Sequence, residues 1–371
     1  MDFDVQEMNT SKSRKRRQAD PVEYAASVLP GLEEVTGDEI EARLKRARVI
    51  ERRRGWVVFR YPGSVADLLR LRTTEDVFVI LFRTARLPTY RKEAIPLLIR
   101  MARNSRHWDE ALTQFHQTQQ RRVRRVTFRV IARMTGTHHF RRQEVRDAVL
   151  AGVRTRWIRW KPVPDDAHME IWASIIGDWA LISIRLSDRT MRHRTYKEAH
   201  RPASLRPTLA AAMVSLSHPR SDDRFCDPMC GVGTLLAERA RAGSYRVLLG
   251  GDVDTDVLHG ASVNLRDNAI CSLHRWDARA LPLRPRSLDA VVCNLPFGEK
   301  TGSHADNPAL YNRFFQQLIY ALRPGGRAVL LTSEKELMRQ LLRRHASFRR
   351  EREILIDVLG QAARIYVLRR K

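Results

Sequence analysis

The second half of the chain alternates short apolar runs with stretches of helical spacing, as expected for a sheet whose strands are joined by helices. The apolar runs predict buried strands at 224–227, 246–251, 272–276 and 288–293. A helix is predicted at 235–242, after the first strand. Each strand ends at or just before a polar residue, and these residues are Asp227, Asp252, Asp277 and Asn294. In open α/β sheets ligands bind outside the carboxyl ends of the strands, so the four residues are predicted to share one site.

The first half has a different pattern, with shorter elements and more cationic side chains between them. Alternating strands and helices are predicted at 22–28, 32–44, 55–60, 65–71 and 77–82. This order of strand, helix, strand, helix and strand indicates a small α/β sheet domain over residues 21–90.

A second module of helices and strands is predicted over residues 91–188. Its expected elements are helices at 94–102, 108–119 and 141–152 and strands at 121–130, 169–174 and 179–186. The strand at 121–130 begins with a run of arginines. Residues 189–371 form the third domain, and residues 1–20 are expected to be a disordered basic arm. An ordinary frayed terminus is the alternative for this arm.

Charge adds a class of partner to this picture. The 371 residues include 67 Lys and Arg against 42 Asp and Glu, which gives a formal net charge of +25. Such a chain is expected to bind polyanions, and the alternative is a basic surface that is only solvated. No apolar run reaches about eighteen residues and no secretory apolar segment is present at the N-terminus. We therefore expect a cytoplasmic protein without a membrane span.

The cysteines bear on redox and metal chemistry, and they are Cys226, Cys230, Cys271 and Cys293. None forms a Cys-x-x-Cys pair, so they are expected to be core thiols in a reducing compartment. A nucleophilic thiol would have to face a base, and only Cys230 and Cys293 are placed for that less favoured alternative. His138-His139 has no further ligand at metal spacing, so no metal is predicted.

The most chemically specific segment is Asn294-Leu295-Pro296-Phe297, at the end of the last predicted strand. An exocyclic amine of a base is a poor nucleophile because its lone pair is spread into a π system. The Asn294 side-chain oxygen and the Leu295 carbonyl can each accept one N–H bond from such an amine. Pro296 fixes the chain direction and Phe297 can stack on the ring. The alternative interpretation is a Pro-containing turn with a core phenylalanine.

Gly231 and Gly233 mark the loop between the first strand and its helix. Without side chains they let a ligand approach the backbone. A dinucleotide fingerprint would need a third small residue where Leu236 stands, so a nicotinamide cofactor is disfavoured. Asp252 ends the second strand, where an acidic residue binds ribose hydroxyls in folds of this type.

Four motifs in this half resemble those of a known enzyme group. They are Asp-Pro-Met-Cys-Gly-Val-Gly-Thr at 227–234, Gly-Asp-Val-Asp at 251–254, Asp277, and Asn-Leu-Pro-Phe-Gly at 294–298. Together they look like the S-adenosylmethionine-dependent RNA methyltransferases of the THUMP-containing group, above all those that form N2-methylguanosine in tRNA. The resemblance covers the chain beyond the first twenty residues and is specific after Met191. Thr195 replaces a usual glycine and Leu295 a frequent proline, and both bear on substrate choice.

The resemblance implies an α/β fold of three parts. A Rossmann-like class I methyltransferase domain with a seven-stranded mixed sheet, residues 189–371, would follow a ferredoxin-like domain at 21–90 and a THUMP RNA-binding domain at 91–188. The implied cofactor is S-adenosyl-L-methionine. The residues that would bind it are Asp227, Met229, Gly231, Gly233, Thr234, Asp252, Val253, Asp277, Ala278 and Asn294.

In this implied site each strand end would bind a different part of the ligand. Asp227 and the glycine loop would face the methionine part, Asp252 the ribose and Asp277 the adenine amine. The catalytic segment Asn294, Leu295, Pro296 and Phe297 would hold the target guanine.

The resemblance also implies a tRNA partner. The THUMP domain would hold the 3′ end of the acceptor arm while the methyltransferase domain, in a monomer, reaches a base at a fixed distance. The implied product is N2-methylguanosine at position 6 of the acceptor stem, with guanosine 10 or an rRNA site as alternatives. Candidate phosphate contacts are Arg121, Arg122, Arg124, Arg125, Arg141, Arg142, Arg194 and Lys197. Each of these could also be a solvated basic side chain.

Three other functions stay open on the sequence. Methylation of adenine N6 or of DNA uses the same four-residue motif but gives no role to the basic N-terminal domains. Protein-glutamine methylation uses a related Asn-Pro-Pro-Tyr motif, and the positive net charge argues against it. An RNA-binding protein with a degenerate methyltransferase domain would bind tRNA without turnover.

Overall fold

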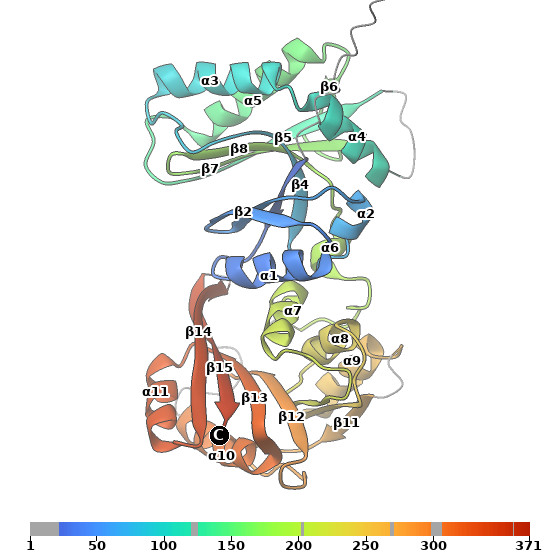
Figure 1. Ribbon diagram of the computed structural model, residues 1–371, viewed down its shortest axis with the longest axis vertical. Helices are drawn as coiled ribbons and strands as arrows, with labels where there is room; N and C mark the ends of the chain where they lie inside the picture. Colours follow the sequence, from blue (N-terminus) through green and yellow to red (C-terminus); the bar gives the residue numbers. More distant parts are fainter. Residues whose placement is uncertain (1–21, 120–124, 202–203, 268–270, 298–305, 359) are drawn as a thin grey trace, which may run out of the picture.

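Two lobes follow one another along the longest axis of the molecule (Figure 1). The computed structural model describes residues 22–119, 125–201, 204–267, 271–297, 306–358 and 360–371. The N-terminal lobe, residues 22–193, is built on an eight-stranded sheet, and the C-terminal lobe, residues 194–371, on a seven-stranded sheet. Among the described residues no helix is long and apolar enough to cross a membrane.

The sheet of the N-terminal lobe has the strand order β2-β3-β1-β4-β8-β7-β5-β6. Its strands are β1 Glu23–Ser27, β2 Arg48–Arg53, β3 Trp56–Arg60, β4 Asp76–Thr84, β5 Thr127–Thr135, β6 Lys161–Pro162, β7 Met169–Ile176 and β8 Trp179–Arg185. The helices of this lobe are α1 Glu33–Arg43, α2 Val65–Leu68, α3 Arg91–Asn104, α4 Trp108–Thr118, α5 Arg142–Arg156 and α6 Thr190–His193.

The two predicted N-terminal domains share this one sheet. β4, from the first, pairs antiparallel with β8, from the second, with Phe78 opposite Arg185. One buried cluster likewise contains Tyr24 and Phe59 from the first domain and Phe128 from the second. The expected boundary near residue 90 therefore separates two halves of a continuous sheet and a continuous core. Such halves are expected to move as one body.

Several elements of this lobe differ from the sequence expectation. The short elements β6 and α6 were not predicted. β2 was not predicted, because it is an edge strand whose arginines are mostly exposed and which lacks an apolar face. β5 begins at Thr127 instead of residue 121. Three arginines of the run expected in that strand lie outside the described residues, namely Arg121, Arg122 and Arg124.

The sheet of the C-terminal lobe confirms the predicted class. Its order is β11-β10-β9-β12-β13-β15-β14, with β15 antiparallel to both neighbours and the other strands parallel to one another. This is a seven-stranded mixed sheet. The strands are β9 Arg224–Asp227, β10 Val247–Asp252, β11 Cys271–Arg275, β12 Leu288–Asn294, β13 Leu322–Thr332, β14 Phe348–Val358 and β15 Gln361–Arg370.

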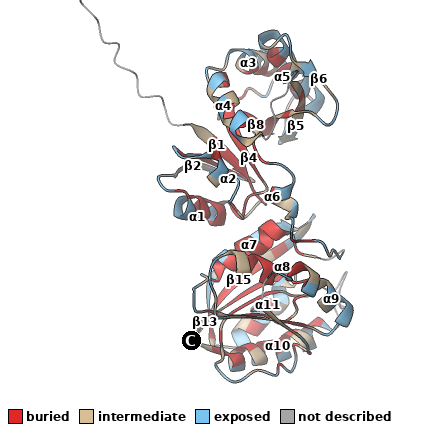
Figure 2. Cartoon of the chain, turned by 90° about the vertical axis from the view of Figure 1, so that its right-hand side faces the viewer, coloured by how far each residue is buried: buried red, intermediate tan, exposed pale blue. Residues whose placement is uncertain are grey.

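Helices cover both faces of this sheet, and its central strands β9, β12 and β13 are mostly buried, whereas the edge strands β11 and β14 are not (Figure 2). Alternation along the strands explains the layers: Phe225 packs with one group of helices, and the next residue, Cys226, packs with the other. The first group is α7 Pro207–Leu216, α8 Thr234–Arg241 and α9 Thr255–Asn264. The second is α10 Asn307–Ala321 and α11 Lys335–Arg344. With both faces covered, the strand ends are left as the place for a ligand.

Candidate active site

The four polar residues singled out by the sequence lie at one edge of the C-terminal sheet. Strands β11, β10, β9 and β12 are parallel neighbours, so their carboxyl ends meet there. In this register Asp227 lies beside Gly250, and Asp252 beside Arg275. Asn294 is the last residue of β12.

Asp227 is the most deeply buried of them, with 1% of its surface exposed. Burial raises the pKa of this carboxyl well above its ordinary value, and the nearby Asp252 raises it further, while the Met229 amide that bonds to it acts in the opposite direction. Its Oδ1 atom has no hydrogen-bond partner. A buried acceptor of this kind is a position where a ligand can supply the missing donor.

The loop after β9 is shaped for close approach. Gly231 has a φ of +50°, and a Cβ added there would meet no atom within 4 Å. Gly233 has a φ of +76° and precedes α8, and a Cβ there would lie 2.9 Å from Leu265. The first glycine thus borders open space, while the second is needed for packing.

Asp252 closes this loop from the neighbouring strand. Its Oδ2 accepts a hydrogen bond from the Gly231 amide at 3.0 Å, and its Oδ1 accepts one from the Asp254 amide at 3.2 Å. Beside it Val253 is 60% exposed. A carboxylate can accept hydrogen bonds from ribose hydroxyls, and an exposed apolar side chain beside it can pack against a base. The pair Asp252 and Val253 therefore suits a nucleoside.

Trp276 belongs to the site and was not predicted. Its indole N–H donates to the Pro228 carbonyl at 3.0 Å, so it ties β11 to the glycine loop. A Cβ added to Gly251 would lie 2.0 Å from its ring. The pair Gly250-Gly251 inside an apolar strand was the available signal, because glycine in a strand often marks the close approach of another group.

Asp277 follows Trp276, and 36% of its side chain is exposed. Its carboxylate is ion-paired with Arg279, whose Nη2 lies 2.6 Å from Oδ2. This hydrogen bond holds the pKa of Asp277 below its usual value. An adenine amine could reach the carboxylate only if Arg279 gave way. The next residue, Ala278, is buried. Thr234, the first residue of α8, is also buried, and Met229 is half-buried against the core.

In the segment Asn294 to Phe297, Leu295 is buried and the other three residues are half-buried. The Asn294 Oδ1 atom is buried without a hydrogen-bond partner. Leu295 has 1% of its surface exposed and donates its amide to Leu331 at 3.0 Å, so this residue can act on a ligand only through its carbonyl. Phe297 is half-buried and packs against the core.

The cysteine alternative is not supported at this edge. Burial raises the pKa of Cys226, Cys230 and Cys293 well above the ordinary thiol value. Thiolates are the nucleophilic form, so these side chains behave as core thiols. In the part of the chain that the structure describes, no three His, Cys, Asp or Glu side chains gather as a metal site.

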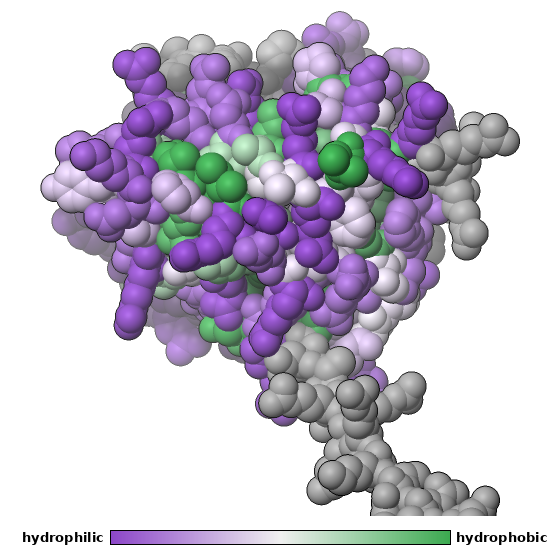
Figure 3. Space-filling view, turned by 90° about the horizontal axis from the view of Figure 1, so that it is seen from above, coloured by the Kyte–Doolittle hydropathy of each residue, from purple (hydrophilic) through white to green (hydrophobic). Residues whose placement is uncertain are grey.

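The predicted RNA contacts separate into three groups. Arg121, Arg122 and Arg124 lie outside the described residues. Arg125, Arg141 and Arg142 are exposed on the N-terminal lobe, whose surface is mainly hydrophilic when seen from above (Figure 3).

Arg194 and Lys197 require a correction, because both side chains are turned into the protein. Arg194 donates to the Arg72 carbonyl at 2.6 Å, and the Lys197 ammonium donates to the Leu205 carbonyl at 2.6 Å. Side chains held in this way are not available to phosphate groups.

Comparisons with known proteins agree with this geometry. The family described as RMKL-like, methyltransferase domain (UPF0020) matches residues 194–358. The chain is 30% identical to a tRNA (guanine(6)-N2)-methyltransferase of Thermus thermophilus over 92% of this chain and 98% of that protein. It is also similar to the crystal structure of TrmN from Thermus thermophilus, with a TM-score of 0.77 and 25% identity, covering 94% of this chain and all of that one.

A mammalian relative is similar over a shorter part. The mouse tRNA (guanine(6)-N(2))-methyltransferase THUMP3 is 28% identical over 66% of this chain. The chain spans about half the length of that relative, 51%.

Proposed function

The chain belongs to the family of tRNA (guanine-N2)-methyltransferases, and we propose from this premise that it transfers a methyl group from S-adenosylmethionine to the exocyclic N2 of a guanosine in tRNA. The observation that carries the proposal is the buried, partnerless Oδ1 of Asn294 at the end of β12. An acceptor left in this state costs about 1–3 kcal/mol unless a ligand donates to it. A guanine amine is such a donor.

The residues at the other strand ends fit the cofactor. The free Oδ1 of Asp227 and the open space beside Gly231 would take the methionine part, and Asp252 the ribose hydroxyls. Asp277 would accept from the adenine amine once Arg279 releases it. When bound, S-adenosylmethionine supplies a methyl group on a sulfonium that is already activated.

The chain's own part in the reaction is then to orient the amine. One N2 hydrogen would bond to the Asn294 Oδ1 and the other to the Leu295 carbonyl, which directs the nitrogen lone pair out of the ring system. Phe297 would stack on the guanine. A paired guanine hides N2 from the site, so the base must leave the helix first. The proton is lost to solvent after transfer, and no strong base is needed beforehand.

Position 6 of the acceptor stem is the specific site we propose. The support is that relatives named for guanine(6) methylation are similar to the chain over 92% and 66% of its length. We further propose that a monomer acts in the cytoplasm. Residues 91–188 would hold the 3′ end of the tRNA as a THUMP domain, with Arg125, Arg141 and Arg142 on phosphates. Guanosine 10 and rRNA are the alternative substrates.

A labelling experiment tests the reaction and its position together. The protein is incubated with methyl-tritiated S-adenosylmethionine and an unmodified tRNA transcript, and a second transcript carries adenosine at position 6. We expect label in N2-methylguanosine with the first transcript and none with the second. Label at another guanosine would overturn the position, and tRNA binding without label would overturn the enzymatic function.

A further inference from the structure

The segment Arg194-Thr195-Tyr196-Lys197 lies between the lobes and contacts both. The Arg194 guanidinium donates to the carbonyl of Arg72 in the N-terminal lobe. Two residues later, the Tyr196 hydroxyl donates to Glu238 Oε1 on α8 at 2.7 Å. The segment therefore connects the two lobes, a role that is separate from the proposed reaction.

Glu238 is the centre of a buried charge cluster at this joint. Its side chain has no exposed surface, and its Oε2 lies 2.6 Å from Nη2 of Arg72, which comes from the opposite lobe. Its Oε1 lies 3.5 Å from Nε of Arg194. A buried carboxylate is tolerated only when such partners surround it, and Nε of Arg72 donates a hydrogen bond of 2.7 Å to Glu238 Oε2. The charge of Glu238 is therefore compensated by a residue of the other lobe.

Both sides of the cluster are themselves fixed. On the N-terminal side, the carboxylate of Glu39 accepts hydrogen bonds from the amides of Arg72 and Thr73, at 2.9 and 2.8 Å. On the C-terminal side, Glu238 lies on α8, the helix that begins after Gly233.

A second connection runs from the joint to the glycine loop. The Asn264 side chain accepts from the amides of Glu198 and Ala199, each at 2.9 Å, and donates to the Val232 carbonyl at 2.9 Å. The chain that follows the segment Arg194 to Lys197 is thus bonded, through Asn264, to the loop that borders the strand-end site.

The rest of the interface is mainly apolar. Leu29, Leu32 and Val35 of the N-terminal lobe belong to the same buried cluster as Leu209 and Met213 of α7. Apolar packing is not directional, so by itself it would tolerate small rotations. The charge cluster has directional contacts and would not.

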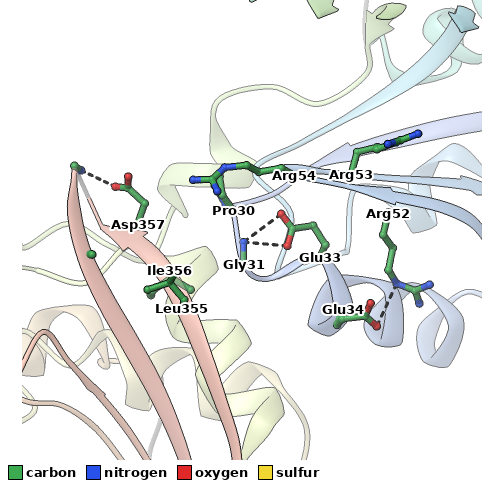
Figure 4. Close-up of a pocket in the computed structure, with 12 residues that line it drawn as sticks. Pro30, Gly31, Glu33, Glu34, Arg52, Arg53, Arg54, Leu355, Ile356 and Asp357 are labelled. Carbon is green, nitrogen blue, oxygen red and sulfur yellow. Dashed lines mark hydrogen bonds and ion pairs between the residues drawn. The ribbon is translucent and has the colours of Figure 1, made fainter. Parts of the chain in front are cut away.

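The lobes also meet beside a hollow of about 500 Å³ (Figure 4). Gly31 stands at its edge with a φ of +103°, and a Cβ there would lie 2.1 Å from the Leu355 carbonyl oxygen. Glu33 holds this turn, because its carboxylate accepts from the Gly31 amide at 2.9 Å. Because the hollow is not filled by side chains, packing at this point does not by itself fix the angle between the lobes. The contacts of the charge cluster are then needed to fix that angle.

We propose that Arg72, Arg194 and Glu238 are positioning residues that lock the two lobes at one distance and so select which nucleotide reaches Asn294. The selection of a nucleotide rests on the proposed function. The locking does not, and it can be measured on the protein alone.

The test uses full-length Glu238→Gln, which keeps the shape of the side chain and removes its charge. Spin labels at Ile158→Cys and Tyr320→Cys report the distance between lobes, since these side chains are 88% and 50% exposed. Cys271→Ser removes the one native cysteine of the described chain that is not buried. We expect the distance distribution to widen at least twofold.

With tRNA, we expect Glu238→Gln to spread label from one guanosine to its neighbours and to lower kcat/KM at least tenfold. Cofactor affinity should stay within twofold of the parent protein. The matched control is Arg206→Gln, which breaks the exposed ion pair of 3.1 Å with Glu75 across the same interface. It should change neither the distance distribution nor the methylated position.

A parent-like distance distribution in Glu238→Gln would overturn the locking, whatever the activity. A widened distribution with an unchanged methylated position would overturn the selection of the nucleotide. If Glu238→Gln does not fold, Arg72→Gln decides by the same two readouts, because it removes the partner of Glu238 that comes from the other lobe. Failure of the parent protein to label any tRNA would refute the proposed function and leave the distance measurement to judge the lock.

Discussion

The hydroxyl of Tyr311 on α10 donates a hydrogen bond of 2.8 Å to the carbonyl oxygen of Pro296, in the middle of the Asn294 to Phe297 segment. Tyr311 is fully buried, and its hydroxyl is also 2.8 Å from Thr332 Oγ1. Because the tyrosine proton points to Pro296, Thr332 must donate to Tyr311, and Thr332 in turn accepts from the Glu334 amide at 3.0 Å. The chain of bonds fixes the Pro296 carbonyl and leaves that of Leu295 for a ligand.

Tyr311→Phe should therefore slow methylation without weakening the cofactor. It leaves the half-buried Pro296 carbonyl without its donor, at a cost of about 1–3 kcal/mol. If the loop then loses its orientation, this cost corresponds to a loss of roughly 10- to 100-fold in kcat. Single-turnover methylation measures the rate, and calorimetry measures cofactor affinity. Tyr320→Phe is the control, since Tyr320 is half-exposed on the same helix. Equal rates for Tyr311→Phe and Tyr320→Phe would contradict the positioning role.

Asn294→Ala and Asp252→Ala should affect different steps. The amide of Asn294 has its oxygen free for the substrate, so its loss should lower kcat by about 10²- to 10³-fold and leave cofactor affinity unchanged. Asp252 holds the Gly231 amide, so its loss should raise the cofactor Kd at least tenfold. Calorimetry with S-adenosylmethionine separates the two. An equal loss of cofactor affinity in both variants would refute the assignment of roles.

Gly231→Ala tests whether the open side of the glycine loop is where the cofactor lies. The added methyl group meets no protein atom within 4 Å, but the φ of +50° makes alanine strained by about 1 kcal/mol. Gly360→Ala has the same two properties, with a φ of +88°, at the turn between β14 and β15. Both should destabilise the fold slightly. Only Gly231→Ala should raise the cofactor Kd, by tenfold or more, and similar affinities in the two variants would place the cofactor elsewhere.

The strand ends could be predicted from sequence because they depend on local patterns. An apolar run locates a strand, and Asp227, Asp252 and Asn294 follow from where each run stops. Tyr311 and Trp276 could not be found in this way. Their contacts to Pro296 and Pro228 span 15 and 48 residues of the chain, and the residues next to Tyr311 and Trp276 do not mark them. The pair Gly250-Gly251 indicates a close approach but not which residue makes it.

The basic residues show a second limit of the sequence. Arg194 and Lys197 have the same chemistry as Arg141 and Arg142, and only the fold distinguishes them, since the first pair is buried at the lobe joint and the second is exposed. Pairing of β4 with β8 could not be predicted from the sequence either. The two strands belong to different modules, and each module by itself has the alternation of strands and helices expected of a separate domain. Charge and periodicity describe a segment, whereas burial depends on what packs against it.

The last prediction concerns Lys197 and the pH dependence of stability. Burial lowers the pKa of Lys197 from 10.5 to about 8, and Glu238 acts in the opposite direction. Between these two values the unfolded chain keeps the proton that the folded protein has lost. The free energy of unfolding contributed by this group therefore rises with pH from about 8 to 10.5. Below pH 8 the buried ammonium of Lys197 lowers the free energy of unfolding by its full amount. Above pH 10.5 the side chain is neutral in both states and no longer lowers it.

Lys197→Met should remove this dependence. The difference in unfolding free energy between the parent and Lys197→Met should grow in favour of the parent by up to about 3 kcal/mol from pH 7 to pH 10.5. Urea denaturation at the two pH values measures it, and other titrating groups cancel in the difference. The exposed Lys335→Met controls for the loss of a positive charge. A difference that stays constant or falls with pH would mean that the folded protein keeps Lys197 charged, held by Glu238 instead of penalised by burial.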